Sequence, residues 1–240
     1  MPVDKNSSPL MQQLALELGP PPPPTFDSFF PGRNAATFAA LRAALASGAR
    51  CIYLWGPQAS GKTHLLRAFV AQRGEPARYA GPGDHFDDSV DDCVDNATGE
   101  SAFAADDVQR LDMVGQVALF DLYNRYRSSG GTLLAAGDRP PAELPLREDL
   151  RTRLGSALVL HLAPLSDEEK AAALSEHARQ RGFRIAPELI EYVLKQVQRD
   201  MGTQMAVVAA LDRTSLERKR PVTLPLVREV LKLLTIKEPR

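Results

Sequence analysis

Short apolar runs alternate with longer amphipathic segments between Thr25 and Leu162, and this pattern predicts strands and helices in turn. Such alternation is typical of an α/β fold, in which helices cover both faces of a parallel five-stranded sheet. We expect strands at 51–55, 77–80, 101–107, 132–137 and 158–162. We expect helices at 35–46, 63–72, 114–127 and 148–155. The sequence therefore predicts a first folded domain over residues 25–164.

The apolar positions within the longest of these helices indicate which of its side chains face the core. They recur at roughly helical spacing along the segment 114–127. The apolar positions of this helix are Val117, Phe120, Leu122, Tyr123 and Tyr126.

The strand pattern stops before Ser166, and only helical periodicity follows. Ser166 and Glu169 have the spacing of a capping box, in which two side chains satisfy free backbone N–H groups at the start of a helix. We expect helices at 166–181, 187–199, 203–218 and 224–234. These residues predict a second, all-helical domain over 165–240.

Residues 1–24 differ in composition from the rest and predict a flexible tail. Five successive prolines, Pro20 to Pro24, favour a stiff polyproline II spacer that holds the preceding segment away from the body. In that segment Leu14, Leu16 and Leu18 alternate, so an extended strand presents all three on one face, and Gln13 can make paired amide hydrogen bonds in a pocket. The pattern indicates a peptide for a partner's groove; a stray apolar patch in an unstructured terminus is the alternative.

The segment from Gly56 to Thr63 reads G-x-x-x-x-G-K-T and lies between an apolar run and a predicted helix. Its backbone N–H groups can converge on phosphate oxygens, because glycine permits the sharp strand-to-helix reversal. Lys62 is expected to reach the β- and γ-phosphates, and the Thr63 hydroxyl to ligate Mg²⁺. A chance glycine-rich turn is disfavoured by this context. The candidate nucleotide-binding residues here are Gly56, Pro57, Gln58, Ala59, Ser60, Gly61, Lys62 and Thr63.

Carboxylates follow two of the other predicted strands. Asp106 and Asp107 end the third strand, and Asp138 ends the fourth, where the next residues include two prolines that stop the strand. Open parallel sheets hold their ligands at the carboxyl ends of strands. We expect Asp106 to hold the Mg²⁺ shell, Asp107 to orient the attacking water, and Asp138 to sense the γ-phosphate.

The overall composition limits the functional classes. Lys and Arg total 29 against 30 Asp and Glu, so the chain lacks the positive field that drives autonomous binding to DNA. The two cysteines give no disulfide framework, and no apolar run is long enough for a membrane span, so we expect a cytoplasmic protein. Between Asp84 and Asp95, His85 and Cys93 suggest a metal site, but their spacing fits no template and a solvated acidic surface is favoured.

These pieces together resemble the AAA+ ATPases, and within them the DnaA branch. The opening of the first domain, 25–29, and the segment 137–141, similar to that family's sensor 1 segment, carry this likeness. The chain is most similar to the Hda family of DnaA-related regulatory inactivators. The stretches that carry that likeness are Phe120–Arg125, Gly137–Pro141, Pro164–Glu168, Arg181–Phe183 and Gln13–Leu18.

The resemblance implies a regulator of replication initiation. Its tail would bind the β-subunit sliding clamp of DNA polymerase through Gln13, Leu14, Leu16 and Leu18, and reach DNA only indirectly. Its partner would be the initiator DnaA, whose bound ATP is hydrolysed in trans with the help of an arginine finger that matches Arg153 here. The resemblance adds His64, Asn34 and Asp138 to the residues that hold ADP or ATP, with Mg²⁺ on Thr63 and Asp106. Assembly with further copies of the chain stays open.

One position departs from the family pattern. Gly202 stands where the family has its sensor 2 arginine, which reaches from the lid to the phosphates; Arg199 lies nearby. This departure predicts weak intrinsic ATP hydrolysis, although Asp107 keeps a water-orienting carboxylate. An autonomous AAA+ ATPase that loads or remodels a replication partner is the alternative. A DNA-binding initiator is disfavoured, because no recognition domain is predicted.

Overall fold

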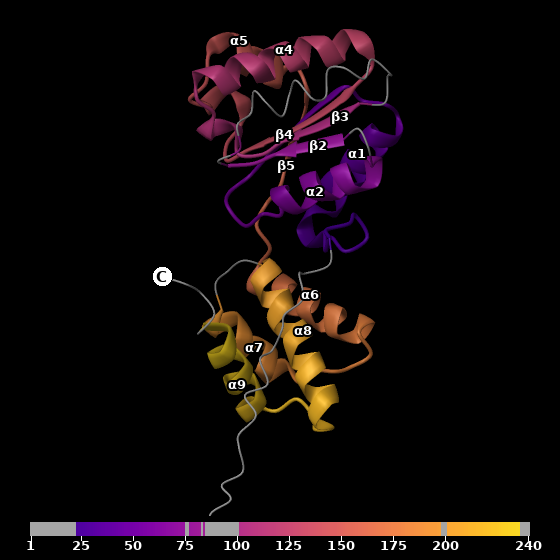
Figure 1. Cartoon of the computed structure of the whole chain (residues 1–240), viewed down its shortest axis with the longest axis vertical. Helices are drawn as coiled ribbons and strands as arrows, with labels where there is room; N and C mark the ends of the chain where they lie inside the picture. Colours follow the sequence, from indigo (N-terminus) through magenta and orange to yellow (C-terminus); the bar gives the residue numbers. More distant parts are fainter. Residues whose placement is uncertain (1–22, 75–76, 83, 85–100, 198–200, 236–240) are drawn as a thin grey trace, which may run out of the picture.

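The computed structural model describes residues 23–74, 77–82, 84, 101–197 and 201–235. They form an α/β domain joined to a helical domain, which lies below it in Figure 1. The clamp-binding motif predicted at 13–18, His85 and Cys93 of the acidic segment, and Arg199 lie outside the described residues. Among the described residues, no helix combines the length and apolar character that a membrane span requires.

The sheet of the α/β domain confirms the predicted parallel arrangement. Its strands are β1 (Cys51–Trp55), β2 (Ala77–Ala80), β3 (Ala102–Ala105), β4 (Thr132–Gly137) and β5 (Leu158–His161). They lie in the order β2-β3-β4-β1-β5, and every neighbouring pair is parallel. Strands β3 and β4 are buried throughout, as expected for strands covered on both faces. The carboxyl ends of β1, β3 and β4 therefore meet at one edge.

Helices cover both faces of the sheet. On one face lie α1 (Ala35–Ala46) and α2 (Lys62–Arg73), and on the other lie α4 (Met113–Ser129) and α5 (Glu148–Gly155), away from the helical domain (Figure 1). Alternation along β1 divides the core: Tyr53 packs toward α4 and α5, whereas Ile52 and Leu54 pack toward α1 and α2. Three short 3₁₀ helices were not predicted: η1 (Gly32–Asn34), η2 (Val108–Arg110) and η3 (Pro141–Glu143).

The core-facing stripe of α4 does not contain all the apolar positions of this helix. Val117 is 41 % exposed, whereas Leu119 is fully buried. The buried residues Leu119, Leu122, Tyr123 and Tyr126 follow the i, i+3, i+4, i+7 spacing of a single helical face. Val117 lies two positions before Leu119, which places it on a different side of the helix. Val117 is therefore an apolar position of this helix that does not face the core, and Phe120 lies at the edge of the core.

The second domain is all-helical, as predicted, with α6 (Asp167–Gln180), α7 (Pro187–Gln196), α8 (Met201–Arg218) and α9 (Leu224–Thr235). The capping box at the start of α6 is present. Helix α7 ends earlier than predicted, because Val197 adopts extended backbone angles (φ −104°, ψ 143°). An ion pair between Arg181 and Asp212 (3.0 Å) joins the end of α6 to α8.

Candidate nucleotide-binding site

The predicted phosphate loop connects β1 to α2 and adopts a conformation that demands glycine. A Cβ on Gly56 would lie 2.1 Å from the carbonyl oxygen of Leu162, so no larger residue fits there. Gly61, the N-cap of α2, has φ 97°, and Ala59 also lies in the left-handed region with φ 62°. Left-handed residues of this kind turn successive N–H groups toward one point, which is the arrangement that anions bind.

Within this loop the Ser60 hydroxyl is buried and has no hydrogen-bond partner among the described residues. An orphaned buried hydroxyl is unusual in a folded protein and calls for a ligand or solvent atom. The unpaired Ser60 hydroxyl and the close approach of the backbone at Gly56 together indicate that the loop fits a polyphosphate.

Lys62 lies folded against the loop. Its Nζ donates hydrogen bonds to the carbonyl oxygens of Gly56 (2.8 Å) and Pro57 (2.9 Å), and the residue is only 7 % exposed. Burial lowers the pKa of the ammonium below its usual range, while Asp106, Asp107 and Asp138 act in the opposite direction. The ammonium of Lys62 is thus desolvated, bound by two backbone carbonyls and influenced by three nearby negative charges. A phosphate bound in the loop would compensate the cost of burying this cation.

The structure brings Thr63 and Asp106 together, as predicted. Thr63 Oγ1 donates to Asp106 Oδ2 at 2.6 Å, and the backbone N–H of Asp107 donates to Asp106 Oδ1 at 3.0 Å. A hydroxyl that donates its proton keeps two lone pairs for a cation. Neutral and anionic oxygens are the donors that Mg²⁺ prefers, so this pair fits the ion. Thr63 would hold Mg²⁺, and Asp106 would orient its hydration shell; the ion would neutralise charge on phosphate oxygens.

Asp107 is strained. Its backbone is left-handed (φ 48°, ψ 46°), which is uncommon for a residue other than glycine, and its Oδ1 accepts from Gln109 Nε2 at 3.1 Å. Strained conformations of this kind concentrate at functional sites. The carboxylates of Asp106 and Asp107 have different hydrogen-bond donors, and the water-orienting role of Asp107 stays a prediction.

Asp138 follows β4 on the same sheet edge, where Arg139 holds its carboxylate. Arg139 Nε and Nη2 donate to its two oxygens at 2.8 and 2.7 Å. These hydrogen bonds are the main reason that the pKa of Asp138 lies below its usual range. The preceding Gly137 packs against the buried Tyr53, whose hydroxyl would lie 2.2 Å from an added Cβ. Asp138 is thus fixed at the edge as an anion, and γ-phosphate sensing remains its predicted role.

Two further residues predicted to contact nucleotide lie beside the loop. Asn34 uses both ends of its amide on Ala163: Nδ2 donates to its carbonyl oxygen and Oδ1 accepts from its N–H, each at 2.8 Å. His64 Nε2 lies 2.9 Å from the carbonyl oxygen of Thr25, and burial lowers the pKa of its imidazole. These hydrogen bonds tie Asn34 to the segment after β5 and His64 to the segment before η1. Nucleotide contact stays a prediction for both residues.

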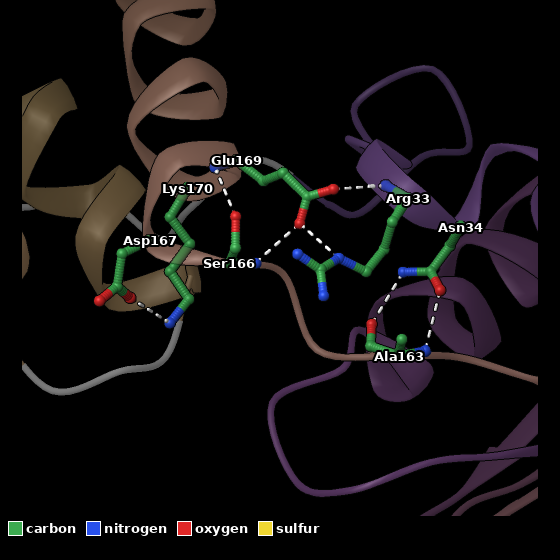
Figure 2. Close-up of polar contacts among 7 residues, drawn as sticks. All are labelled: Arg33, Asn34, Ala163, Ser166, Asp167, Glu169 and Lys170. Carbon is green, nitrogen blue, oxygen red and sulfur yellow. Dashed lines mark hydrogen bonds and ion pairs between the residues drawn. The ribbon is translucent and has the colours of Figure 1, made fainter.

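One carboxylate fastens the helical domain to the α/β domain (Figure 2). Glu169 Oε1 accepts from the Arg33 backbone N–H, and Oε2 accepts from Arg33 Nε and from the Ser166 N–H, all at 2.7 Å. Ser166 Oγ in turn accepts from the Glu169 N–H at 3.2 Å. A Cβ on Gly32 would lie 2.6 Å from Leu165 Cδ2, so the turn approaches the junction closely. Glu169 therefore serves as the helix cap and as the link between domains.

Replacing Glu169 by alanine is expected to loosen the orientation of the helical domain. The substitution removes the acceptor of three hydrogen bonds, two of which come from the other domain. Electron paramagnetic resonance between spin labels at Gln72 in α2 and Glu217 in α8 would measure it, with Cys51 and Cys93 replaced by serine. The distance distribution should broaden in the variant.

The same measurement as a function of pH tests the charge of Glu169. Its pKa lies below the ordinary value of 4.5, chiefly because the Ser166 N–H bonds to it, with Arg33 contributing. The contribution of this link is therefore present above about pH 4.5 and is lost as the pH falls through the lower, folded-state pKa. Ser166→Ala is the matched control: it weakens the helix by about 1 kcal/mol but leaves the link intact. Equal broadening in both variants would contradict the role of Glu169 between domains.

Arg153, the predicted arginine finger, lies on α5, on the opposite face of the sheet from α2. Its guanidinium carbon lies 5.8 Å from the ring centroid of Phe120 and 6.0 Å from that of Tyr123. The residue lines a surface hollow together with Phe120, Glu148, Asp149 and Thr152. In the part of the chain that the structure describes, Arg153 forms no ion pair, whereas Arg147 on the same helix pairs with Asp149.

Two features of the site escaped sequence reasoning. Tyr79 at the end of β2 donates from its hydroxyl to Asp106 Oδ2 at 3.0 Å, and Arg33 binds Glu169. Tyr79 could have been noticed, because it stands near a predicted strand end on the ligand-binding edge. The pairing of Arg33 with Glu169 spans 136 residues, and no local pattern signals it.

Comparisons with known proteins agree with this architecture. Residues 167–231 match the family model described as the lid domain of Hda. Domain III of the replication initiation protein DnaA from Thermotoga maritima is similar over 88 % of this chain and 97 % of its own, with 24 % identity and a TM-score of 0.67. AMPPCP-bound DnaA from Aquifex aeolicus is 22 % identical over 81 % of this chain and 68 % of its own, with a TM-score of 0.62.

A protein of another kind has the same fold. The RuvB Holliday junction branch migration motor of Thermotoga maritima is 18 % identical over 90 % of this chain and 73 % of its own, with a TM-score of 0.65. At such identities these solved structures establish the fold alone, whereas the family-model match concerns the helical domain.

Proposed function

We propose that this chain, whose helical domain matches the lid-domain model of Hda and whose fold is similar to that of DnaA, regulates replication initiation by stimulating hydrolysis of ATP bound to DnaA. It binds ADP or ATP with Mg²⁺ at its own phosphate loop. It docks on the sliding clamp through Gln13, Leu14, Leu16 and Leu18, and it offers Arg153 to the partner's nucleotide.

The observation that carries this proposal is the placement of Arg153. The guanidinium lies over the rings of Phe120 and Tyr123 beside a surface hollow, and it lacks an ion pair among the described residues. Its helix, α5, lies on the sheet face opposite to α2. An arginine used only for stability is normally paired or solvated, whereas one that completes another molecule's site must be held outward and left available. Contact with the rings of Phe120 and Tyr123 limits the conformations of the Arg153 side chain. This lowers the entropy that the side chain would lose when it binds the partner's nucleotide.

The phosphate loop has a supporting role in this proposal. Lys62 and the loop N–H groups hold the phosphates, and Thr63 with Asp106 holds Mg²⁺. DnaA of Aquifex aeolicus binds the nucleotide analogue AMPPCP. In this chain, the phosphate loop has room only for glycine at position 56, which supports nucleotide binding here. Nucleotide bound at the junction of the two domains shapes the protein for its partner.

An autonomous ATPase is the second candidate, and the paired Thr63 and Asp106 favour it. Against it stands Gly202, an exposed residue at the second position of α8, where the resembling family has an arginine. Glycine has no side chain to reach the phosphates. Turnover of ATP by the isolated protein at a rate equal to that with DnaA present would favour the autonomous enzyme and overturn the regulator.

The proposed function is tested by reconstitution. ATP-loaded DnaA, clamp-loaded DNA and this chain should together hydrolyse the DnaA-bound ATP faster than DnaA alone or DnaA with unloaded clamp. Labelled ATP bound to DnaA before mixing identifies the molecule whose nucleotide is hydrolysed. No acceleration in the complete mixture would contradict the proposal.

Replacing Leu16 and Leu18 by alanine tests the clamp-binding motif. Each leucine would contribute about 1.5–3 kcal/mol when fully buried in a groove, so the double variant should bind the clamp at least about 100-fold more weakly. Surface plasmon resonance with immobilised clamp measures the effect. The matched control is Leu10→Ala, which lies outside the motif, and nucleotide affinity should stay at the parent value in both. If the double variant binds the clamp with the same affinity as the parent, residues 13–18 are an incidental apolar patch and not a clamp-binding motif.

A further inference from the structure

The carboxylate of Asp106 has a third donor, from an edge strand of the sheet. Tyr79 donates from its hydroxyl to Asp106 Oδ2 at 3.0 Å, and the same oxygen accepts from Thr63 Oγ1 at 2.6 Å. The Asp107 N–H occupies Oδ1. Asp106 is only 5 % exposed, so its orientation depends on these protein donors. Tyr79 and Thr63 therefore hold the same oxygen from two sides.

The position of Tyr79 is itself fixed. The guanidinium carbon of Arg67 lies 5.1 Å from the centroid of its ring, and Gly81 approaches the ring so closely that an added Cβ would lie 2.9 Å from it. Burial, with Asp106 as the next cause, raises the pKa of the Tyr79 phenol to about 12. A tyrosine hydroxyl carries its proton at neutral pH without any such shift, so it is a donor to Asp106 on geometry alone.

We propose that Tyr79 is a positioning residue for Mg²⁺, acting through the carboxylate of Asp106. This inference rests on the proposed binding of Mg–nucleotide at the same site. Hydrogen-bonded partners of metal ligands orient them and tune their affinity. Because Tyr79 anchors Oδ2 independently of Thr63, the Thr63 hydroxyl can adjust to the cation while the carboxylate stays in place.

The Mg²⁺ dependence of nucleotide affinity tests this role without any hydrolysis. The affinity for a fluorescent ADP analogue is measured by titration in saturating MgCl₂ and again in EDTA, for the parent and for Tyr79→Phe. We expect the gain in affinity from Mg²⁺ to fall by about 10-fold in the variant, as is typical for loss of an outer-shell partner. The affinity in EDTA should equal that of the parent, which also shows that the variant is folded.

A matched variant and a double-mutant cycle separate positioning from packing. Tyr192 in the helical domain also carries an arginine over its ring, with the guanidinium carbon of Arg228 at 5.7 Å, so Tyr192→Phe should keep the full gain. If Tyr79 acts through Asp106, then Tyr79→Phe should cause no further loss in an Asp106→Ala background.

The outcomes distinguish this inference from the proposed function. The positioning role would be overturned if Tyr79→Phe gained as much nucleotide affinity from Mg²⁺ as the parent does. It would also be overturned if Tyr79→Phe lowered that gain equally in the parent and in the Asp106→Ala background. Neither outcome would contradict nucleotide binding itself. A parent protein that gains no affinity from Mg²⁺ would instead overturn the proposed Mg–nucleotide site.

Discussion

Replacing Arg153 by alanine is expected to reduce the stimulation of ATP hydrolysis on DnaA by about 1,000-fold or more, the range that arginine fingers supply in trans. The guanidinium would neutralise charge that develops on the γ-phosphate of the partner's ATP, and alanine leaves that charge without a partner. Single-turnover hydrolysis of labelled ATP preloaded on DnaA, with clamp-loaded DNA present, measures the effect. The chain's own affinity for ADP should stay at the parent value, because Arg153 lies on the opposite face of the sheet from α2.

The matched control for Arg153 lies on the same helix. Arg151 is also half-buried in α5 and carries the same charge, so Arg151→Ala reports the general effect of removing a positive charge there. It should retain most of the stimulation, since its guanidinium does not rest on Phe120 and Tyr123. Full activity of Arg153→Ala, or equal losses in the two variants, would show that Arg153 is not the finger.

The sheet could be predicted from sequence because its physical signal is local. Strands β3 and β4 are largely apolar runs, as required of parallel strands buried on both faces. Two aspartates follow β3, and Gly137 with two later prolines marks the end of β4. The phosphate loop was predicted for a similar reason, since its glycines are needed by conformations that the loop itself adopts. The 3₁₀ helices η1, η2 and η3 were not predicted, because three residues are too few to show a helical pattern of apolar positions.

Features of the site that depend on tertiary arrangement could not be predicted. The hydrogen bond from Tyr79 to Asp106 requires β2 to lie next to β3, and nothing in the two segments specifies that order. The link from Arg33 to Glu169 requires the relative position of two domains. Glu169 was predicted only as a helix cap, because the capping spacing is local whereas its bonds to Arg33 are not.

These two tertiary features bear on how nucleotide acts in this chain. An arginine from the lid would normally couple lid position to the phosphates, and Gly202 removes that route in the resembling position. Glu169 joins the helical domain to the α/β domain through protein groups alone. In the proposed function, nucleotide would then act on the helical domain mainly through the phosphate loop. This arrangement suits a protein whose nucleotide maintains a shape for its partner.

Replacing Lys62 by alanine is expected to weaken binding of ADP and ATP by on the order of 100-fold. The ammonium is nearly buried, and loss of one partner from a buried charge pair typically costs about 2–5 kcal/mol, which corresponds to this range or more. In the variant, no lysine would compensate the charge of a bound phosphate. The phosphate would instead be repelled by the three carboxylates whose charges now act on Lys62, which are those of Asp106, Asp107 and Asp138. Titration with a fluorescent ADP analogue measures the affinity, and Lys195→Ala, at an exposed position in the lid, is the control.

The same variant decides what nucleotide does for the partner's reaction. If nucleotide shapes the protein, Lys62→Ala should lose stimulation of DnaA at low ADP and regain most of it once ADP is raised enough to fill the weakened site. Arg153→Ala should not be rescued by any ADP concentration, because its defect lies in the other molecule's site. Rescue of both variants, or of neither, would contradict the separation between a nucleotide that organises this chain and an arginine that serves the partner.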